Sequence, residues 1–180
     1  MRVVVYFGGL KQAKEMYYRG RKIKEAWYGG QRVFSGKPVE VMPAVSGTYG
    51  ARNWLREKLT EYGEDYQTVE EIPFEIDTSQ VTTMRKMFYG CSSLIAAPPM
   101  DTSQVTDMYE MFYGCSSLTT VPDRDTSQVT DMMYMFQKCS SLTDGNVRLI
   151  GKNPSVRTGL MISSSGLTRE PFYDSSGRPI

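Results

Sequence analysis

The sequence predicts an α/β repeat fold, a short solenoid of 24-residue coils with a parallel strand ladder, preceded by a small antiparallel β meander. Three observations predict it. Residues 77–94 return at 101–118 and again at 125–142, both times at an offset of 24. The segment before these repeats carries aromatic pairs that alternate with glycine-rich turns, and the charge of the chain changes sign near residue 42. A 24-residue unit is too short to bury an apolar side alone, so it must stack on its copies.

The chain has 180 residues and a formal net charge of +1, and charged residues make up 23% of it. Residues 1–42 carry nine basic and three acidic side chains, a net charge of +6, which leaves −5 for residues 43–180. A basic segment can bind nucleic acid or dock on an acidic protein. Docking is favoured here, because the basic residues alternate with apolar ones along predicted strands and do not cluster.

The N-terminal segment predicts strands at about 3–7, 12–18, 21–28 and 31–35. Each glycine-containing turn between them follows an aromatic pair and suits a tight hairpin. Four short strands bury little apolar surface by themselves. We therefore expect residues 1–42 to form an antiparallel docking module that buries a face against another chain.

The remainder divides into a linker and N-terminal cap at 43–76, three repeats at 77–145, and a C-terminal cap and tail at 146–180. In the cap, residues 53–63 predict a helix that ends at Gly63. In each repeat, the i, i+3, i+4 spacing of residues such as Met84, Met87 and Phe88 predicts one face of a short helix. A short strand at 118–121 follows in the second repeat and is expected to end at Pro122. Residues 146–150 are expected to supply the last strand.

The three cysteines, Cys91, Cys115 and Cys139, lie at the same position in successive repeats. A zinc site needs paired spacings and usually four ligands, and an odd number of cysteines leaves one unpaired. We therefore expect a buried column of free thiols, with no metal site.

Candidate catalytic groups are few. The chain has no histidine, which excludes Ser-His-Asp and Cys-His catalysis. Asp77, Asp101 and Asp125 stack at one repeat position and could act as paired carboxylates, although such an aspartate more often caps a turn by accepting backbone amides. The repeat tyrosines could anchor a partner or pack on neighbouring coils, and the sequence leaves both open. We predict no enzymatic activity and no cofactor.

The repeat motif D-T-S-x-V-T-x-M-x-x-M-F-x-G-C-S-S-L resembles the BspA-like leucine-rich repeat over about residues 69–145. Lys138 departs from it, since glycine stands at that position in the other copies. The resemblance implies a leucine-rich-repeat solenoid that binds or displays, found in bacterial surface proteins and bacteriophage particles. Residues 3–36 more loosely resemble the N-terminal modules of virion proteins, often minor tail proteins, of phages that infect actinobacteria.

These resemblances imply a bacteriophage virion structural protein, a minor tail or tail-tip protein assembled in the host cytoplasm. The alternatives are a bacterial cell-surface adhesin and a capsid decoration protein. No signal peptide or membrane span is expected from the sequence. The partners implied are other virion proteins, copies of the chain in a symmetric assembly, and a host-surface ligand; nucleic acid is not favoured. The candidate interaction surface consists of Tyr6, Phe7, Tyr17, Tyr18, Trp27, Tyr28, Arg19, Arg21, Lys22, Tyr89, Tyr109, Tyr113 and Tyr134.

Overall fold

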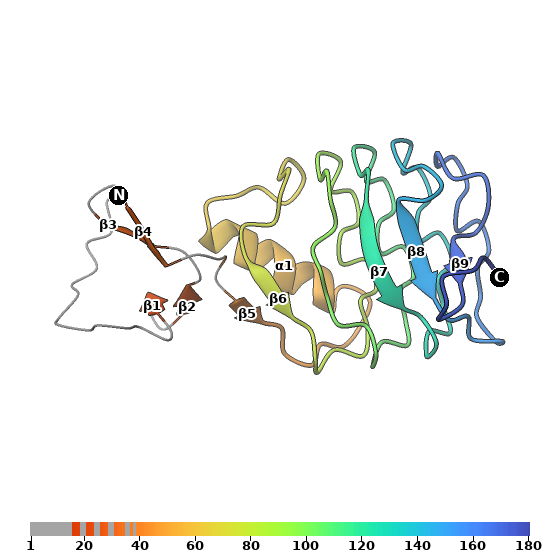
Figure 1. Cartoon of the computed structure of the whole chain (residues 1–180), viewed down its shortest axis with the longest axis horizontal. Coiled ribbons are helices and arrows are strands. Elements are labelled where there is room, and N and C mark those ends of the chain that lie inside the picture. Colours follow the sequence, from red (N-terminus) through yellow and green to blue (C-terminus); the bar gives the residue numbers. More distant parts are fainter. Residues whose placement is uncertain (1–15, 19–20, 24–25, 29–30, 35–36, 38) are drawn as a thin grey trace. The chain divides into compact units, whose positions relative to one another are not determined.

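The computed structural model describes residues 16–18, 21–23, 26–28, 31–34, 37 and 39–180. The chain forms two compact units, Met1–Val39 and Glu40–Ile180. The second unit contains all three repeats (Figure 1).

The described strands of the first unit form two separate hairpins. β1 (Met16–Tyr18) pairs with β2 (Arg21–Ile23), and β3 (Ala26–Tyr28) pairs with β4 (Gln31–Phe34), both antiparallel. The predicted four-stranded meander is therefore wrong, because these strands belong to two-stranded sheets. The first predicted strand, at 3–7, lies outside the described residues.

Helix α1 (Gly50–Glu61) opens the second unit and forms where the sequence predicts a helix. Its apolar side chains Ala51, Leu55 and Leu59 recur at i, i+4 and i+8 and are buried. The chain leaves the helix at Gly63, whose φ of 81° is a conformation that glycine adopts without steric cost. The helix packs on the segment just before the first repeat, where the ring of Phe74 lies 6.3 Å from that of Trp54.

The remaining strands are short. β5 (Val39–Val41) pairs with β6 (Glu75–Asp77), while β7 (Val121–Asp125), β8 (Val147–Ile150) and β9 (Phe172–Tyr173) form a three-stranded parallel sheet. Figure 1 shows β7, β8 and β9 side by side. β7 runs through Pro122, contrary to the predicted strand end, because the register shifts between Val121 and Arg124 and no ladder bond is needed there.

The repeats stack through their turn segments. Within these segments, backbone amides at alternate residues donate to the carbonyls of the next repeat, with four such bonds at each junction, at 2.8–3.2 Å. The amides between them bond locally, as in the contact from Met87 N to the carbonyl of Met84, 3.1 Å away. Each segment is therefore held half by its own turns and half by its neighbour.

The predicted fold class is thus wrong. Within the residues that the structure describes, there is one α-helix, outside the repeats, and there are only small sheets of two or three strands. The leucine-rich-repeat solenoid, with a helix in every coil and a continuous parallel strand ladder, is not what forms. A helix is blocked because Lys86, Glu110 and Tyr134 have φ of 58°, 52° and 61°, and because alternate amides point to the next repeat instead of to residue i−4.

The inward-facing residues of the repeats are nevertheless those that the spacing predicts. The phenylalanines stack in a column, with ring centroids 5.2 Å apart between Phe88 and Phe112 and 5.7 Å apart between Phe112 and Phe136. Beside them, the three cysteines are buried and free, as predicted. The Cys115 thiol donates to the carbonyl of Phe88 at 3.0 Å. Burial raises the pKa of Cys91 to about 12, so this thiol is protonated at neutral pH.

A further coil follows the three repeats, where the sequence predicts a cap and tail. Met132 N donates to Arg157 O, and Phe136 N donates to Met161 O, both at 2.8 Å. Each acceptor lies two residues further along the chain than in the equivalent bonds between repeats, so the offset here is 26 residues instead of 24. Residues 157–164 therefore continue the turn segments of the repeats. β8 is not the last strand, because β9 lies beyond it.

Replacing Lys138 with glycine is expected to stabilise the protein. Lys138 keeps the left-handed backbone of the glycines that it replaces in the motif, with a φ of 62°. A side chain in this conformation costs about 1–2 kcal/mol, so Lys138→Gly should raise the free energy of unfolding by about 0.5–1 kcal/mol after glycine's greater unfolded-state entropy is subtracted. Urea unfolding measures the change.

Gly114→Ala is the matched control for that prediction. Gly114 has a φ of 73°, and the nearest atom to an added Cβ is the Cα of Gly90 at 3.8 Å, so no clash interferes. We expect a loss of about 1 kcal/mol. A stabilising Gly114→Ala together with a destabilising Lys138→Gly would contradict the assigned conformations.

Candidate functional site

The turn segments present one continuous surface, which we call the turn face and define as the outward-pointing side chains of residues 83–90, 107–114 and 131–138. Its geometry follows from the backbone, because residues whose side chains are not in the buried columns must point outward. Equivalent side chains of successive repeats lie next to one another, since their backbones are joined by hydrogen bonds.

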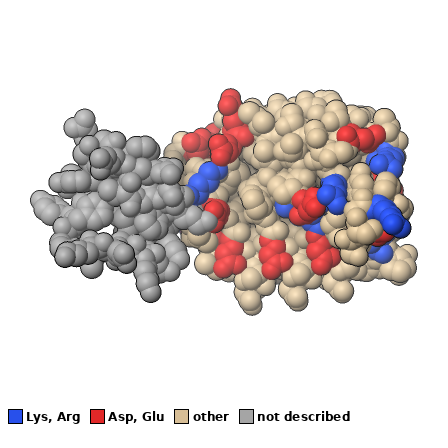
Figure 2. All heavy atoms as spheres, in the orientation of Figure 1, with Lys and Arg blue, Asp and Glu red and all other residues tan. Residues whose placement is uncertain are grey.

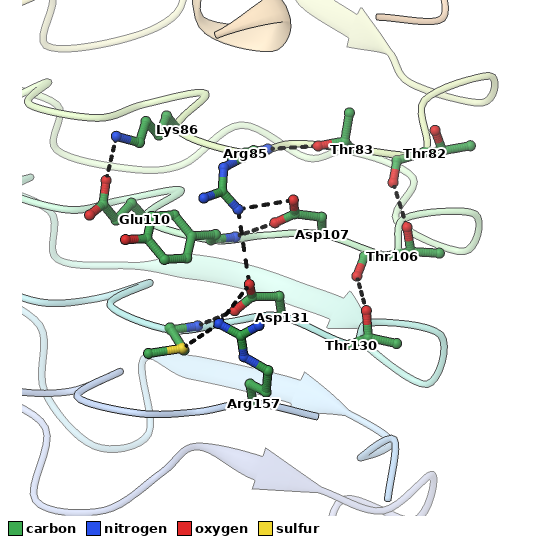
Figure 3. Close-up of polar contacts among 12 residues, drawn as sticks. Thr82, Thr83, Arg85, Lys86, Thr106, Asp107, Glu110, Thr130, Asp131 and Arg157 are labelled. Atoms are coloured by element: carbon green, nitrogen blue, oxygen red, sulfur yellow. Dashed lines mark hydrogen bonds and ion pairs between the residues drawn. The ribbon is translucent and has the colours of Figure 1, made fainter. Parts of the chain in front are cut away.

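Ion pairs join neighbouring repeats across the turn face (Figure 3). Arg85 Nη1 lies 3.2 Å from Asp107 Oδ2 and 3.9 Å from Asp131 Oδ2. Arg157, from the next coil, reaches Asp131 Oδ2 at 3.5 Å. Lys86 Nζ lies 2.9 Å from Glu110 Oε2. Both aspartates also accept a backbone amide two residues on, which fixes their carboxylates in place.

The tyrosines of the turn face form two contacts between repeats. The rings of Tyr89 and Tyr113 stack at 4.9 Å, and Tyr109 meets Tyr134 edge-on at 5.6 Å. All four are half-buried, so the two alternatives left open by the sequence both apply: they pack on neighbouring repeats and still present one side to solvent.

Cations lie over these rings. The guanidinium carbon of Arg85 is 3.8 Å from the ring centroid of Tyr109, and Lys138 Nζ is 5.1 Å from that of Tyr113. Burial, together with the adjacent Glu110, raises the pKa of Tyr109. The hydrogen bond to Tyr113 raises the pKa of Lys138. The turn face therefore offers tyrosine rings with cations over them, and tyrosine and arginine side chains are enriched at protein-binding hot spots.

The remaining predicted site residues lie in the first unit. Tyr6, Phe7 and Arg19 fall outside the described residues. The others are placed on strands: Tyr17 and Tyr18 on β1, Arg21 and Lys22 on β2, and Trp27 and Tyr28 on β3. The β1–β2 register sets Tyr17 opposite Lys22 and Tyr18 opposite Arg21.

The repeat aspartates act as turn caps. Asp77 Oδ1 accepts the amide of Ser79 at 3.0 Å, and Asp101 and Asp125 accept the equivalent amides at 2.9 Å. The bond from Ser103 lowers the pKa of Asp101. All three carboxylates are thus occupied by their own backbone, and the lowered pKa of Asp101 does not favour a general acid at that position.

Two further kinds of site, a metal site and a membrane span, were sought in the part of the chain that the structure describes. Its cysteine and carboxylate side chains form no group of three or more able to hold a metal ion. Among the same residues, none of the helical structure has the length and apolarity needed to cross a bilayer.

The charged residues of the turn face were not among the predicted site residues. The sequence contains a signal for one of their ion pairs, because Lys86 and Glu110 occupy the same position in successive repeats and carry opposite charges. Comparing the copies for their differences, and not only for their identities, would have predicted that ion pair. The contact of Arg157 could not be predicted in this way, because the last coil departs from the 24-residue offset.

Comparison with known proteins identifies one family. Residues 58–153, more than half of the chain, match the model of a family described as a Mycoplasma protein of unknown function, DUF285, which is related to the BspA-like leucine-rich-repeat proteins. No curated protein and no solved structure matches the chain. The resemblance of residues 3–36 to phage modules has no counterpart in these comparisons and stays a prediction.

Proposed function

The chain belongs to the DUF285 family of proteins of unknown function, and from that premise we propose that it is a non-catalytic, protein-binding component of a bacteriophage virion, of the minor tail or tail-tip type. In this proposal the first unit docks on the particle and the turn face of the second unit binds a protein, either another virion protein or a ligand on the host surface.

The observation that carries the binding proposal is the turn face itself. Its tyrosines are held by ring contacts at 4.9 and 5.6 Å, and its cations by ion pairs between repeats. Side chains that are already ordered lose little conformational entropy when a partner binds. Aromatic and arginine side chains also contribute most of the binding energy at typical protein interfaces.

The virion proposal rests on different support, namely the resemblance of residues 3–36 to tail-protein modules and the charge of +6 on residues 1–42. A positive module suits an acidic neighbour in a particle, and its attachment should weaken at high salt. The division of the chain near residue 39 supports separate attachment and binding units. A symmetric assembly of copies would follow from repeated attachment sites.

One observation favours an alternative. The matched family is described as a Mycoplasma protein, which supports a bacterial surface adhesin that uses the same turn face. A capsid decoration protein would share every feature of the tail proposal except its position in the particle.

The experiment is genetic complementation of the phage with variants of the chain. Deletion of residues 1–36 should leave the second unit folded but absent from purified particles, as measured by quantitative mass spectrometry. The full chain with Tyr89→Ala and Tyr113→Ala should enter particles normally, while adsorption to host cells or retention of a neighbouring virion protein falls about tenfold or more, as loss of two hot-spot residues predicts.

A matched double variant, Ile95→Ala with Thr119→Ala, changes two adjacent outward residues of neighbouring repeats outside the turn face. It should behave as the unchanged chain. Full incorporation of the variant that lacks residues 1–36 would contradict the docking role of the first unit. Absence of the full chain from particles would contradict the virion proposal and favour the surface adhesin. If the tyrosine variant matches the control, the turn face is not the binding surface.

A further inference from the structure

The stacking of the repeats leaves one edge open. At every junction, four alternate amides of one coil donate to four carbonyls of the next. In the last coil the equivalent donors are the amides of Thr158, Leu160, Ile162 and Ser164. None of the four has an acceptor within the residues that the structure describes.

This edge already has the conformation of a paired one. The intervening amides bond locally as in the other coils: Met161 N donates to Thr158 O at 2.9 Å, and Ser163 N to Leu160 O at 3.2 Å. Leu160 and Ser164 have φ of 55° and 56°, close to those of their equivalents. Successive amides in such turn conformations form a positively polarised concavity that attracts acceptors. The opposite end of the stack differs, because α1 packs there.

The side chains around the edge also point to a partner. Leu160 is 58% exposed at a position where the three repeats carry half-buried Lys86, Glu110 and Tyr134. The side chain of Arg157, just before the first free amide, pairs with Asp131 at 3.5 Å on one side and is still 64% exposed. Residues 146–180 contain five basic and two acidic side chains. Figure 2 shows Lys and Arg side chains gathered at the end of the second unit that carries β9.

We propose that the open edge, defined as the amides of Thr158, Leu160, Ile162 and Ser164 with the Leu160 side chain, binds an acidic, turn-forming segment of a partner protein. The segment supplies carbonyl oxygens at alternate residues, as the next repeat would, and its carboxylates face the basic end of the unit. Main-chain bonds of this kind give affinity, while side chains give specificity.

A second copy of the chain does not fit this edge. Two open edges brought together would set donors against donors. At the carbonyl end of the stack, Tyr66 already donates to Met87 O at 2.9 Å, and Arg52 of α1 lies over the ring of Tyr89. The net positive charge of residues 146–180 also disfavours a second copy, since a basic end repels its own copy and attracts an acidic segment. The proposal uses different residues from the turn face and holds whether or not the chain is a virion protein.

The test uses the full chain and a synthetic peptide with the sequence of residues 101–118, with serine in place of Cys115 and blocked ends. This peptide contains Asp101, Asp107 and Glu110 and no basic residue. Its neutral control carries the corresponding amides. Amide hydrogen exchange by NMR should show the four edge amides slowing about tenfold or more at saturation, while the locally bonded amides of Met161 and Ser163 change less than about twofold.

Two variants sharpen the result. Leu160→Glu should weaken binding of the acidic peptide by about tenfold or more, because it removes an apolar contact and adds a like charge. Ile95→Glu, at an apolar residue that is 48% exposed elsewhere, should leave binding unchanged. Thermal midpoints establish that both variants fold.

Three results would overturn the proposal. The first is equal binding of the acidic and neutral peptides, or no binding at millimolar peptide. The second is protection that spreads over both alternate sets of amides. The third is protection of the four edge amides that rises with protein concentration in the absence of peptide, which would show that another copy covers the edge.

Discussion

Replacing Phe112 with alanine is expected to lower the free energy of unfolding by about 3–5 kcal/mol, the usual cost of removing a fully buried aromatic side chain. Phe112 has no exposed surface and lies between Phe88 and Phe136 in the central repeat. Both neighbouring rings would therefore face the cavity, and backbone bonds on each side limit how far the repeats can collapse into it. Urea unfolding followed by circular dichroism measures the change.

Tyr109→Ala is the matched control in the same repeat. Tyr109 is half-buried and points outward, so its loss removes the contacts with Arg85 and Tyr134 but opens no cavity. We expect a cost of about 1 kcal/mol. Equal costs for the two variants would show that the central column does not carry the stability of the stack.

Replacing Arg124 with methionine is expected to raise the free energy of unfolding by about 1–3 kcal/mol, as replacement of a buried charge by an apolar side chain of similar size often does. Arg124 is 1% exposed and forms no ion pair with any described residue. Its Nη2 donates to Pro98 O at 2.6 Å, but its Nε has no partner in the described part of the chain. The residues at the positions equivalent to Arg124 in the neighbouring coils are apolar: Met100 lies one repeat earlier, and Leu149 pairs with Arg124 in the β7–β8 register.

The gain in the free energy of unfolding from Arg124→Met should depend on pH in one direction. Burial lowers the pKa of Arg124 to about 10. The unfolded chain therefore binds more protons than the folded chain between about pH 10 and the ordinary arginine pKa, and this group's contribution to stability rises with pH in that window. The advantage of Arg124→Met should be complete at pH 7 and smaller at pH 10.5.

Arg148→Met controls for the loss of a surface charge on the adjacent strand. Arg148 is 40% exposed and pairs with Asp123 at 3.5 Å, and we expect a change within about 0.5 kcal/mol. A strongly destabilised Arg124→Met would mean that the bond to Pro98 outweighs the cost of burying the charge. An advantage that grew above pH 10 would contradict the lowered pKa.

The candidate site was predictable only in part. The repeat position of Tyr89, Tyr109, Tyr113 and Tyr134 placed them on a common surface, and the structure brings them into contact. The ion pairs of that surface join different repeats, and charges such as that of Arg157 depend on an irregular offset. Tyr6, Phe7 and Arg19 lie outside the described residues, so their place in the interaction surface stays a prediction.

The sequence by itself determined which residues face the core and which repeats stack. The identity of residues 77–94, 101–118 and 125–142 fixes their register, and their apolar spacing fixes the buried columns, because apolar side chains leave water wherever the backbone allows. Helix α1 was determined in the same way, by the spacing of its buried face and by Gly63.

The tertiary structure decided the backbone of each repeat. The spacing of Met84, Met87 and Phe88 fits a helix and fits a series of turns equally well, since both bring these positions to one side. Amides that find carbonyls in the next repeat no longer need residue i−4, and this choice exists only once the repeats are stacked. For the same reason the last coil is recognisable from its bonds to Met132 and Phe136 and not from its sequence.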